Sequence, residues 1–75
     1  GEIYLSDLEG LEVRTGTGQR VGEVLGFLSY GGNDVMRIAR EVGEEALVPY
    51  RPEFVARTSF EEKFLVLTEL AEGLL

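Results

Sequence analysis

The chain has 75 residues, of which 14 are acidic and 7 are basic, so its formal net charge at neutral pH is -7. This length limits it to one small domain, and the absence of cysteine excludes the disulfide-rich secreted scaffolds. The additional absence of histidine removes the usual acid–base and nucleophilic groups, and the acidity disfavours direct binding to a phosphate backbone.

The ends and the hydropathy of the chain set expectations for its organisation. No apolar run approaches the roughly 20 residues of a membrane span, and no signal-peptide pattern opens the chain. We therefore expect a cytoplasmic protein without a membrane partner. Gly1-Glu2 stands where a methionine would begin a complete protein and resembles a cut linker. We expect residues 1–75 to be a single domain excised from a longer protein.

The first part of the chain predicts a turn and a β-hairpin. Residues 6–10 form a turn or a single helical turn, in which Asp7 accepts backbone N–H groups and Gly10 takes positive φ. Residues 11–14 alternate apolar and charged side chains, as a half-buried strand does. The glycine-rich residues 15–19 are expected to be a hairpin connection.

The longest predicted strand covers residues 21–30. Gly22 and Gly26 share one face of it, which costs stability unless a bulge, a bend or a close neighbour makes use of them. Small barrels need such bends in order to close. A turn at residues 31–34 leads into a further alternating strand at residues 35–40.

The last part of the chain predicts three more strands and an apolar tail. Residues 46–49 form a strand ending in Pro49, which belongs at a strand end because it lacks an N–H donor. Strands at residues 54–58 and 64–68 follow, and residues 69–75 have apolar side chains at helical spacing. The fold class is therefore all-β: a small, strongly bent antiparallel β-barrel of about six strands with a short C-terminal helical turn.

Two motifs invite a chemical interpretation that the sequence does not sustain. The pairs Glu44-Glu45 and Glu61-Glu62 are better explained as solvated loop charge, because adjacent strand residues point to opposite faces. Residues 15–18 resemble a phosphate-binding loop but lack its lysine and its following helix. We therefore expect no catalytic activity, no cofactor and no metal.

The remaining candidates for function are surface residues. Tyr50, Arg51 and Tyr4 belong to the residue types favoured as anchors in protein interfaces. The alternative is that the tyrosines close the ends of the barrel. The four phenylalanines are expected in the core by default (Phe27, Phe54, Phe60 and Phe64). Acidity favours a basic partner, although it also serves plain solubility.

An ordered set of short motifs is similar to one known family. Residues 3–13 resemble the opening aromatic-x-x-Asp-Leu-x-Gly-x-x-Val segment of PRC-barrel domains, and residues 21–24 match the Gly-x-Val strand that follows. Residues 32–35 resemble the Asn-Asp-Val turn of the C-terminal domain in the RimM family of ribosome maturation factors. That family's Leu-(Ile/Val)-Pro-(Phe/Tyr) segment and its Gly-Leu-Leu tail match residues 47–50 and 72–75.

This resemblance implies a non-catalytic assembly factor, in which residues 1–75 would be the C-terminal domain of a longer two-domain protein. Such proteins assist maturation of the small (30S) ribosomal subunit, including 16S rRNA processing, and bind a basic protein of the subunit head, number nineteen of the small-subunit series. Members often have two consecutive aromatics in the opening segment, tied to ribosome association. Here Ile3 and Tyr4 take these places, so the resemblance carries the contact role to Tyr4.

We predict a partner-binding surface made of Tyr4, Leu5, Tyr50, Arg51 and Phe54. An acidic rim would steer the domain to the basic partner, and these side chains would dock. The alternative left open is a PRC-barrel scaffold or regulatory module that docks to a membrane complex or a small ligand.

Overall fold

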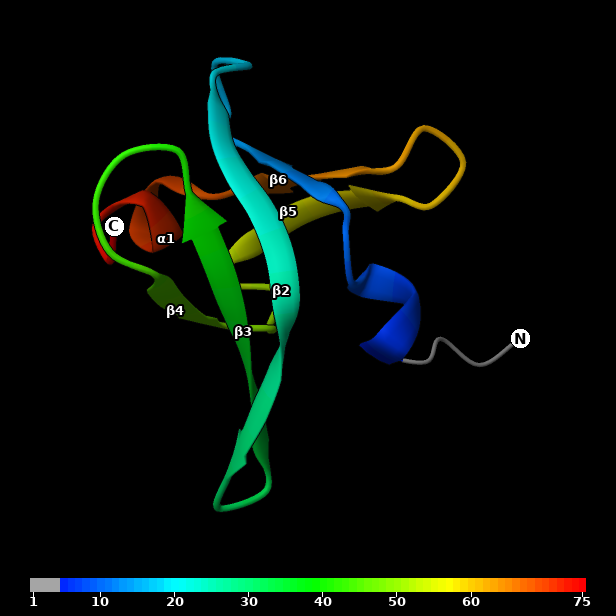
Figure 1. Cartoon of the computed structure of the whole chain (residues 1–75), viewed down its shortest axis with the longest axis vertical. Coiled ribbons are helices and arrows are strands. Elements are labelled where there is room, and N and C mark those ends of the chain that lie inside the picture. The colour runs from blue at the N-terminus through cyan, green and yellow to red at the C-terminus, as the bar shows by residue number, and fades with distance from the viewer. Residues whose placement is uncertain (1–4) are drawn as a thin grey trace.

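The structure, a computed structural model, describes residues 5–75; of Leu5 only the backbone is described. Six strands and two short helices follow one another along residues 5–75 (Figure 1). In order they are η1 (Leu5–Leu8), β1 (Glu12–Arg14), β2 (Arg20–Tyr30), β3 (Asn33–Arg40), β4 (Ala46–Pro49), β5 (Val55–Ser59), β6 (Phe64–Leu67) and α1 (Glu69–Glu72). The all-β prediction with a C-terminal helical turn is confirmed.

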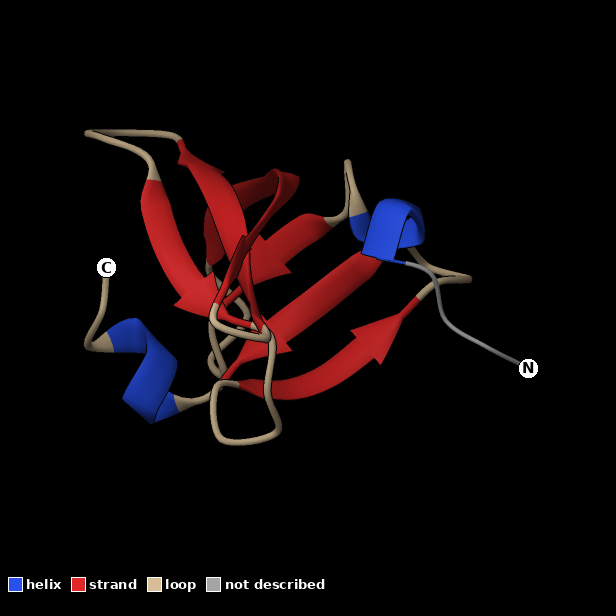
Figure 2. Ribbon diagram, turned by 90° about the horizontal axis from the view of Figure 1, so that it is seen from below, coloured by secondary structure: helices blue, strands red, loops and turns tan. Residues whose placement is uncertain are grey.

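The strands form one curled sheet in the order β4-β3-β2-β1-β6-β5. All neighbouring strands are antiparallel except β1 and β6, which run parallel with Glu12 opposite Phe64. The sheet wraps around a common interior, with η1 and α1 on opposite sides of it (Figure 2). The sequence predicted a purely antiparallel barrel, and the parallel pair is the difference. Alternation of side chains does not specify which strand lies beside which.

Glycines allow the long β2–β3 hairpin to turn and bend. Gly31 and Gly32 both take positive φ, as a two-residue hairpin turn of the favoured hand requires, so the turn is shorter than predicted. A Cβ atom on Gly22 would clash with the carbonyl oxygen of Ala39. The pairing register shifts between Val24 and Gly26. The prediction that the two glycines serve a close approach and a bulge is confirmed.

The core fills the inside of the curled sheet. It consists of apolar side chains that are almost fully shielded from solvent, chiefly Leu8, Val13, Val24, Met36, Ile38, Val48, Leu65, Leu67 and Ala71. Leu8 anchors η1 in this core, and Ala71 anchors α1. Thr68 caps α1 by accepting a hydrogen bond from the Ala71 N–H, and its hydroxyl donates to the carbonyl of Glu53 at 2.6 Å. The tail thus packs against the barrel through Ala71, while Leu70 and Leu74 are exposed.

Candidate functional site

The predicted contact residues fall into two groups along the chain. Tyr4 lies outside the described residues, and Leu5 begins η1. Tyr50 and Arg51 directly follow β4, and Phe54 directly precedes β5. The structure therefore brings Tyr50, Arg51 and Phe54 together where the chain passes from one edge of the sheet to the other.

Tyr50 connects the end of β4 to β5. Its ring meets that of Phe27 edge-on, with centroids 6.0 Å apart and an interplanar angle of 88°. Its hydroxyl lies 3.3 Å from the Thr58 Oγ1 atom of β5, a distance at the long end for such a bond. Tyr50 is half-buried, so it both closes the barrel and presents part of its ring at the surface.

Phe54 faces the core more than the solvent. It is half-buried and packs against the buried core cluster. Its N–H donates to the carbonyl of Arg51, and its carbonyl accepts from Thr68 N–H, at 2.9 and 3.0 Å. These bonds fix the turn between β4 and β5. Because Phe54 is half-buried, only part of the residue is available to a partner.

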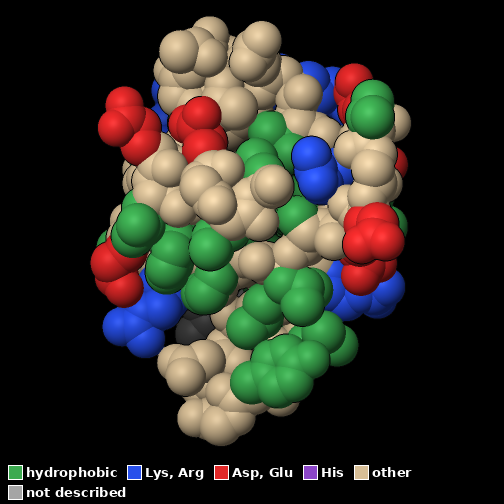
Figure 3. Space-filling model, turned by 90° about the vertical axis from the view of Figure 1, so that its left-hand side faces the viewer, with side chains coloured by type: hydrophobic (Ala, Val, Ile, Leu, Met, Phe, Trp, Pro, Cys, Tyr) green, Lys and Arg blue, Asp and Glu red, His purple; other side chains and the backbone are tan. Residues whose placement is uncertain are grey.

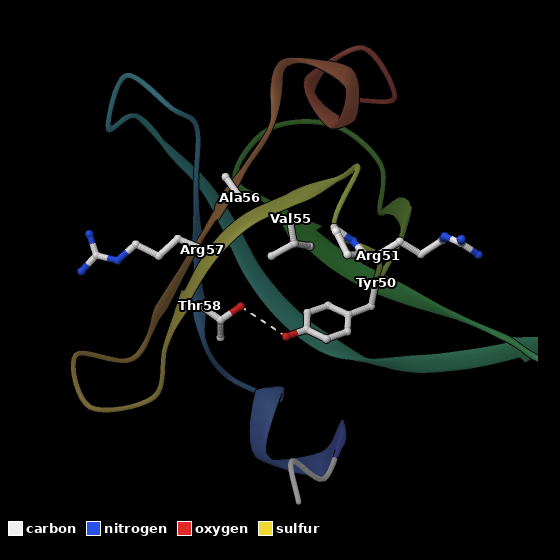
Figure 4. A pocket seen from close by; sticks show the side chains of 7 residues that line it. Tyr50, Arg51, Val55, Ala56, Arg57 and Thr58 are labelled. Atoms are coloured by element: carbon white, nitrogen blue, oxygen red, sulfur yellow. Dashed lines mark hydrogen bonds between the residues drawn. The ribbon is translucent and has the colours of Figure 1, made fainter.

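An open groove lies beside these residues (Figure 4). We call it the Tyr50 groove; its volume is about 250 Å³, and it is lined by Tyr50, Arg51, Pro52, Val55, Ala56, Arg57 and Thr58. Tyr50 and Thr58 meet along one wall, and the side chains of Arg51 and Arg57 extend from opposite ends (Figure 4). Its lining contains no acidic residue.

The two arginines of the groove differ in their partners. Arg51 Nε donates to Glu53 Oε2 at 3.0 Å, and its Nη1 lies 3.3 Å from Asn33 Oδ1. The Arg57 guanidinium lies 5.2 Å from the centroid of the Phe64 ring, within cation–π range. Within residues 5–75, no carboxylate oxygen comes within 4.0 Å of Arg57.

A second hollow, of opposite charge, lies beside η1. We call it the η1 hollow; its volume is about 300 Å³, and it is lined by Asp7, Glu9, Gly10, Leu11, Phe60 and Lys63. Phe60 was predicted in the core, but its side chain is 38% exposed. It sits in the turn between β5 and β6, where the neighbouring Glu61 and Glu62 are the signal that marks a surface turn. Sequence reasoning missed this hollow because its residues are far apart in the chain.

Elsewhere, arginines are tied to glutamates in exposed ion pairs. Arg37 Nη2 and Nε donate to the two oxygens of Glu45 at 2.6 and 3.1 Å. These hydrogen bonds, with the positive charge behind them, hold the pKa of the Glu45 carboxyl below its ordinary value. Arg20 is hydrogen-bonded to Glu41 and lies 3.1 Å from Glu12. These ion pairs with glutamates neutralise much of the positive charge of the arginines, and the excess of acidic residues remains on the surface.

The described residues lack grouped metal ligands and a helix able to cross a membrane, and apolar side chains are exposed on one face. Within residues 5–75, no three His, Cys, Asp or Glu side chains are grouped so as to hold a metal ion. Across the same residues, no helix has the length and apolar character that crossing a membrane takes. The face that carries β4 and α1 shows apolar side chains interspersed with charged ones (Figure 3). Leu47 of β4 and Leu70 of α1 are among the exposed apolar residues.

Comparisons with known proteins agree with this architecture. The family model described as "RimM PRC barrel domain" matches residues 5–74. A ribosome maturation factor RimM of Geobacillus kaustophilus is 40% identical over 75 residues, covering 100% of this chain and 42% of the relative. Its counterpart in Bartonella tribocorum is 34% identical over 73 residues, covering 97% of this chain and 40% of the relative.

One solved structure gives the same result. A crystal structure from Pseudomonas aeruginosa, described as a 16S ribosomal RNA processing protein RimM, superposes with a TM-score of 0.80 at 27% identity. The match covers 88% of this chain and 43% of that one. The chain therefore spans less than half the length of these relatives.

Proposed function

Because this chain belongs to the RimM PRC-barrel family, we propose that it is a non-catalytic binding domain of a ribosome maturation factor. The names of its relatives speak of ribosome maturation and of 16S ribosomal RNA processing. In this proposal the whole protein acts in the cytoplasm on the small ribosomal subunit. The domain contributes a surface and no reacting group.

The proposed partner is a basic protein of the small-subunit head, number nineteen in the small-subunit series. A net charge of -7 raises the local concentration of a basic partner and speeds its encounter with the domain. Docking would hold that partner in a productive conformation during 30S maturation and be lost as the mature site forms. The acidic domain itself is not expected to grip RNA directly.

The observation that carries this proposal is the η1 hollow. Its lining combines the carboxylates of Asp7 and Glu9 with the exposed ring of Phe60. Lysine and arginine side chains have a charged tip and an apolar stem, so one such side chain can satisfy both features at once. The hollow also lies at η1, which begins at Leu5 and directly follows Tyr4 in the chain. We therefore propose Tyr4 and Leu5 as contacts beside it.

Tyr50, Arg51 and Phe54 stay in the proposal as a second contact region. They lie at the Tyr50 groove or beside it, where the charged lining residues are arginines. A basic partner would meet this region with polar or apolar groups, because two like charges brought together repel each other. We expect these three residues to contribute less to affinity for a basic partner than the η1 hollow does.

The test is calorimetric titration of the domain into the purified head protein at two salt concentrations. Tyr4→Ala is expected to weaken binding by at least about 1 kcal/mol without unfolding the domain. The double variant Asp7→Asn/Glu9→Gln should weaken binding and reduce its salt dependence. The control is Glu44→Gln/Glu69→Gln, which makes the same change in net charge at exposed positions outside the hollow.

The outcomes separate local docking from general acidity. A larger loss in the Asp7/Glu9 variant than in its control supports docking at the η1 hollow. Equal losses would show that only the net charge matters and would remove the hollow from the proposal. If the folded partner does not bind at either salt concentration, the domain alone does not recognise this protein.

A further inference from the structure

The strand β5 forms one edge of the sheet. It pairs with β6 on one side, and among residues 5–75 no strand pairs with its other side. The edge strand at the opposite end of the sheet, β4, does not close the ladder with it. An open edge presents unpaired N–H and C=O groups, which are a template for another extended chain. The N–H of Val55 is not one of them, because it donates to the carbonyl of Arg51 at 2.9 Å.

The Tyr50 groove runs beside this open edge. The apolar groups of Pro52, Val55 and Ala56 belong to its lining, while Tyr50 and Thr58 form one wall (Figure 4). The register of β5 against β6 shifts between Val55 and Arg57, so Ala56 is an extra, exposed residue of this strand. The small methyl group of Ala56 leaves room for the side chain of an occupant. A larger residue at this position would fill that room.

The charge of the groove is opposite to that of the whole chain. Arg51 and Arg57 extend from its two ends, and the groove lining contains no carboxylate, although the chain carries 14 acidic residues. Arg57 is held against the Phe64 ring at 5.2 Å and has no carboxylate within 4.0 Å among the described residues. An anionic occupant can therefore pair with Arg57 without first displacing a carboxylate of residues 5–75.

We propose that the Tyr50 groove binds an extended acidic peptide segment of a partner protein, which adds to the sheet alongside β5. The segment has a carboxylate near each end, for Arg51 and Arg57, and small apolar side chains between them. β5 has 5 residues, which corresponds to about 16 Å of extended chain at ~3.3 Å per residue. A peptide of about seven residues spans the strand with one residue beyond each end.

The groove favours a peptide over RNA. The N–H and C=O groups of an edge strand are matched by another peptide backbone, whereas a sugar–phosphate backbone offers no N–H donor. RNA also relies on free aromatic faces for stacking. Tyr50 instead packs edge-on with Phe27, and its hydroxyl faces Thr58. A net charge of -7 repels a polyanion at long range, while a short peptide with two carboxylates is repelled much less.

The experiment uses a fluorescent synthetic peptide of about seven residues with aspartates near both ends and valine and alanine between them. Fluorescence anisotropy gives its affinity, and amide chemical shifts of the labelled chain locate it. We expect the largest shifts at residues 55–59. Replacing the central residue of the peptide by proline is expected to weaken binding at least about tenfold, because it removes a ladder donor.

Charge variants test the arginines. Arg57→Gln is expected to weaken peptide binding about two- to fivefold, the range of an exposed ion pair. Arg40→Gln is the matched control, because Arg40 is likewise without a carboxylate within 4.0 Å among residues 5–75 and does not line the groove. A peptide with lysines in place of the aspartates should not shift the amide signals of residues 55–59 in the native chain. It should gain affinity for Arg57→Glu.

Several results would overturn the inference. These are no binding of the acidic peptide, equal losses in Arg57→Gln and Arg40→Gln, or shifts confined to residues outside β5 and the groove. Tighter binding of a single-stranded RNA of the same length would assign the groove to a nucleic acid instead. None of these results bears on the η1 hollow, so this inference and the proposed ribosomal partner can fail separately.

Discussion

The η1 hollow and the Tyr50 groove are similar in size and opposite in charge. Their volumes are about 300 and 250 Å³, but two carboxylates line the first, with one lysine, and two arginines line the second. Both contain exposed apolar surface. The net charge of -7 affects how a partner approaches from a distance. The charge of the residues that line each hollow affects which groups of a partner can dock there. The two proposals therefore assign a basic partner to the η1 hollow and an acidic peptide to the Tyr50 groove.

The largest expected effect on stability comes from substituting Leu8, which anchors η1 and with it the η1 hollow. Leu8 is fully buried and joins η1 to the core, so Leu8→Ala should cost about 2–5 kcal/mol in the free energy of unfolding. That is comparable to the ~3–5 kcal/mol available to a domain of this size. Urea denaturation measures the loss. Leu25→Ala, at a leucine that is 45% exposed, is the control and should stay within about 0.5 kcal/mol. Equal losses would contradict the anchoring role.

The next largest effect on stability comes from substituting Tyr50 in the wall of the Tyr50 groove. Tyr50→Ala removes a half-buried ring from Phe27, and it should cost about 2 kcal/mol, below the ~3–5 of a fully buried aromatic residue. Tyr50→Phe keeps the ring and should cost less than about 1 kcal/mol, because the lost hydroxyl contact is long. Tyr30→Ala, at a ring that is 57% exposed, is the matched control and should be nearly neutral. A large loss of stability in Tyr50→Phe would show that the contact of the Tyr50 hydroxyl with Thr58 stabilises the wall of the groove.

The smallest expected effect concerns the exposed ion pair between Arg37 and Glu45. Glu45 lies outside both hollows, and Arg37 holds its pKa below the ordinary carboxyl value. A carboxyl with a lowered folded pKa stabilises the fold above its unfolded pKa, and this contribution is lost as pH falls through the folded pKa.

The free energy of unfolding of the native chain and of Glu45→Gln, measured as a function of pH, tests this direction. The native chain should be slightly more stable near neutral pH, and the difference should vanish as acid protonates Glu45. Glu44→Gln, at an exposed neighbouring carboxyl, is the control. A difference that grows toward low pH would contradict the assigned direction.

Much of the fold follows from local patterns. Alternation predicted the strands, and the pairs of glycines predicted where the β2–β3 hairpin turns and closes up on itself. These features depend on residues that are neighbours in the chain or across one tight turn. The parallel neighbour of β1 depends on a distant segment, and periodicity carries no information about it.

The candidate sites were less accessible to sequence reasoning. Tyr50 and Arg51 were predicted from residue type, and the groove beside them agrees with a surface role without testing it. Phe60 was assigned to the core because phenylalanine usually is, yet it follows β5 in a turn flanked by acids. The difference in charge between the two hollows depends on which arginines form ion pairs with glutamates. That outcome is fixed only when the strands are assembled.

The parallel pair of β1 and β6 sets an order of events in folding. Glu12 lies opposite Phe64, so the first strand meets the last only after nearly the whole chain is available. Hairpins such as β2–β3 close short loops and form quickly, whereas this pairing must close a long one. During synthesis β1 therefore waits with an open edge until β6 has emerged. Joining these two strands is expected to limit the rate at which the domain reaches its native state.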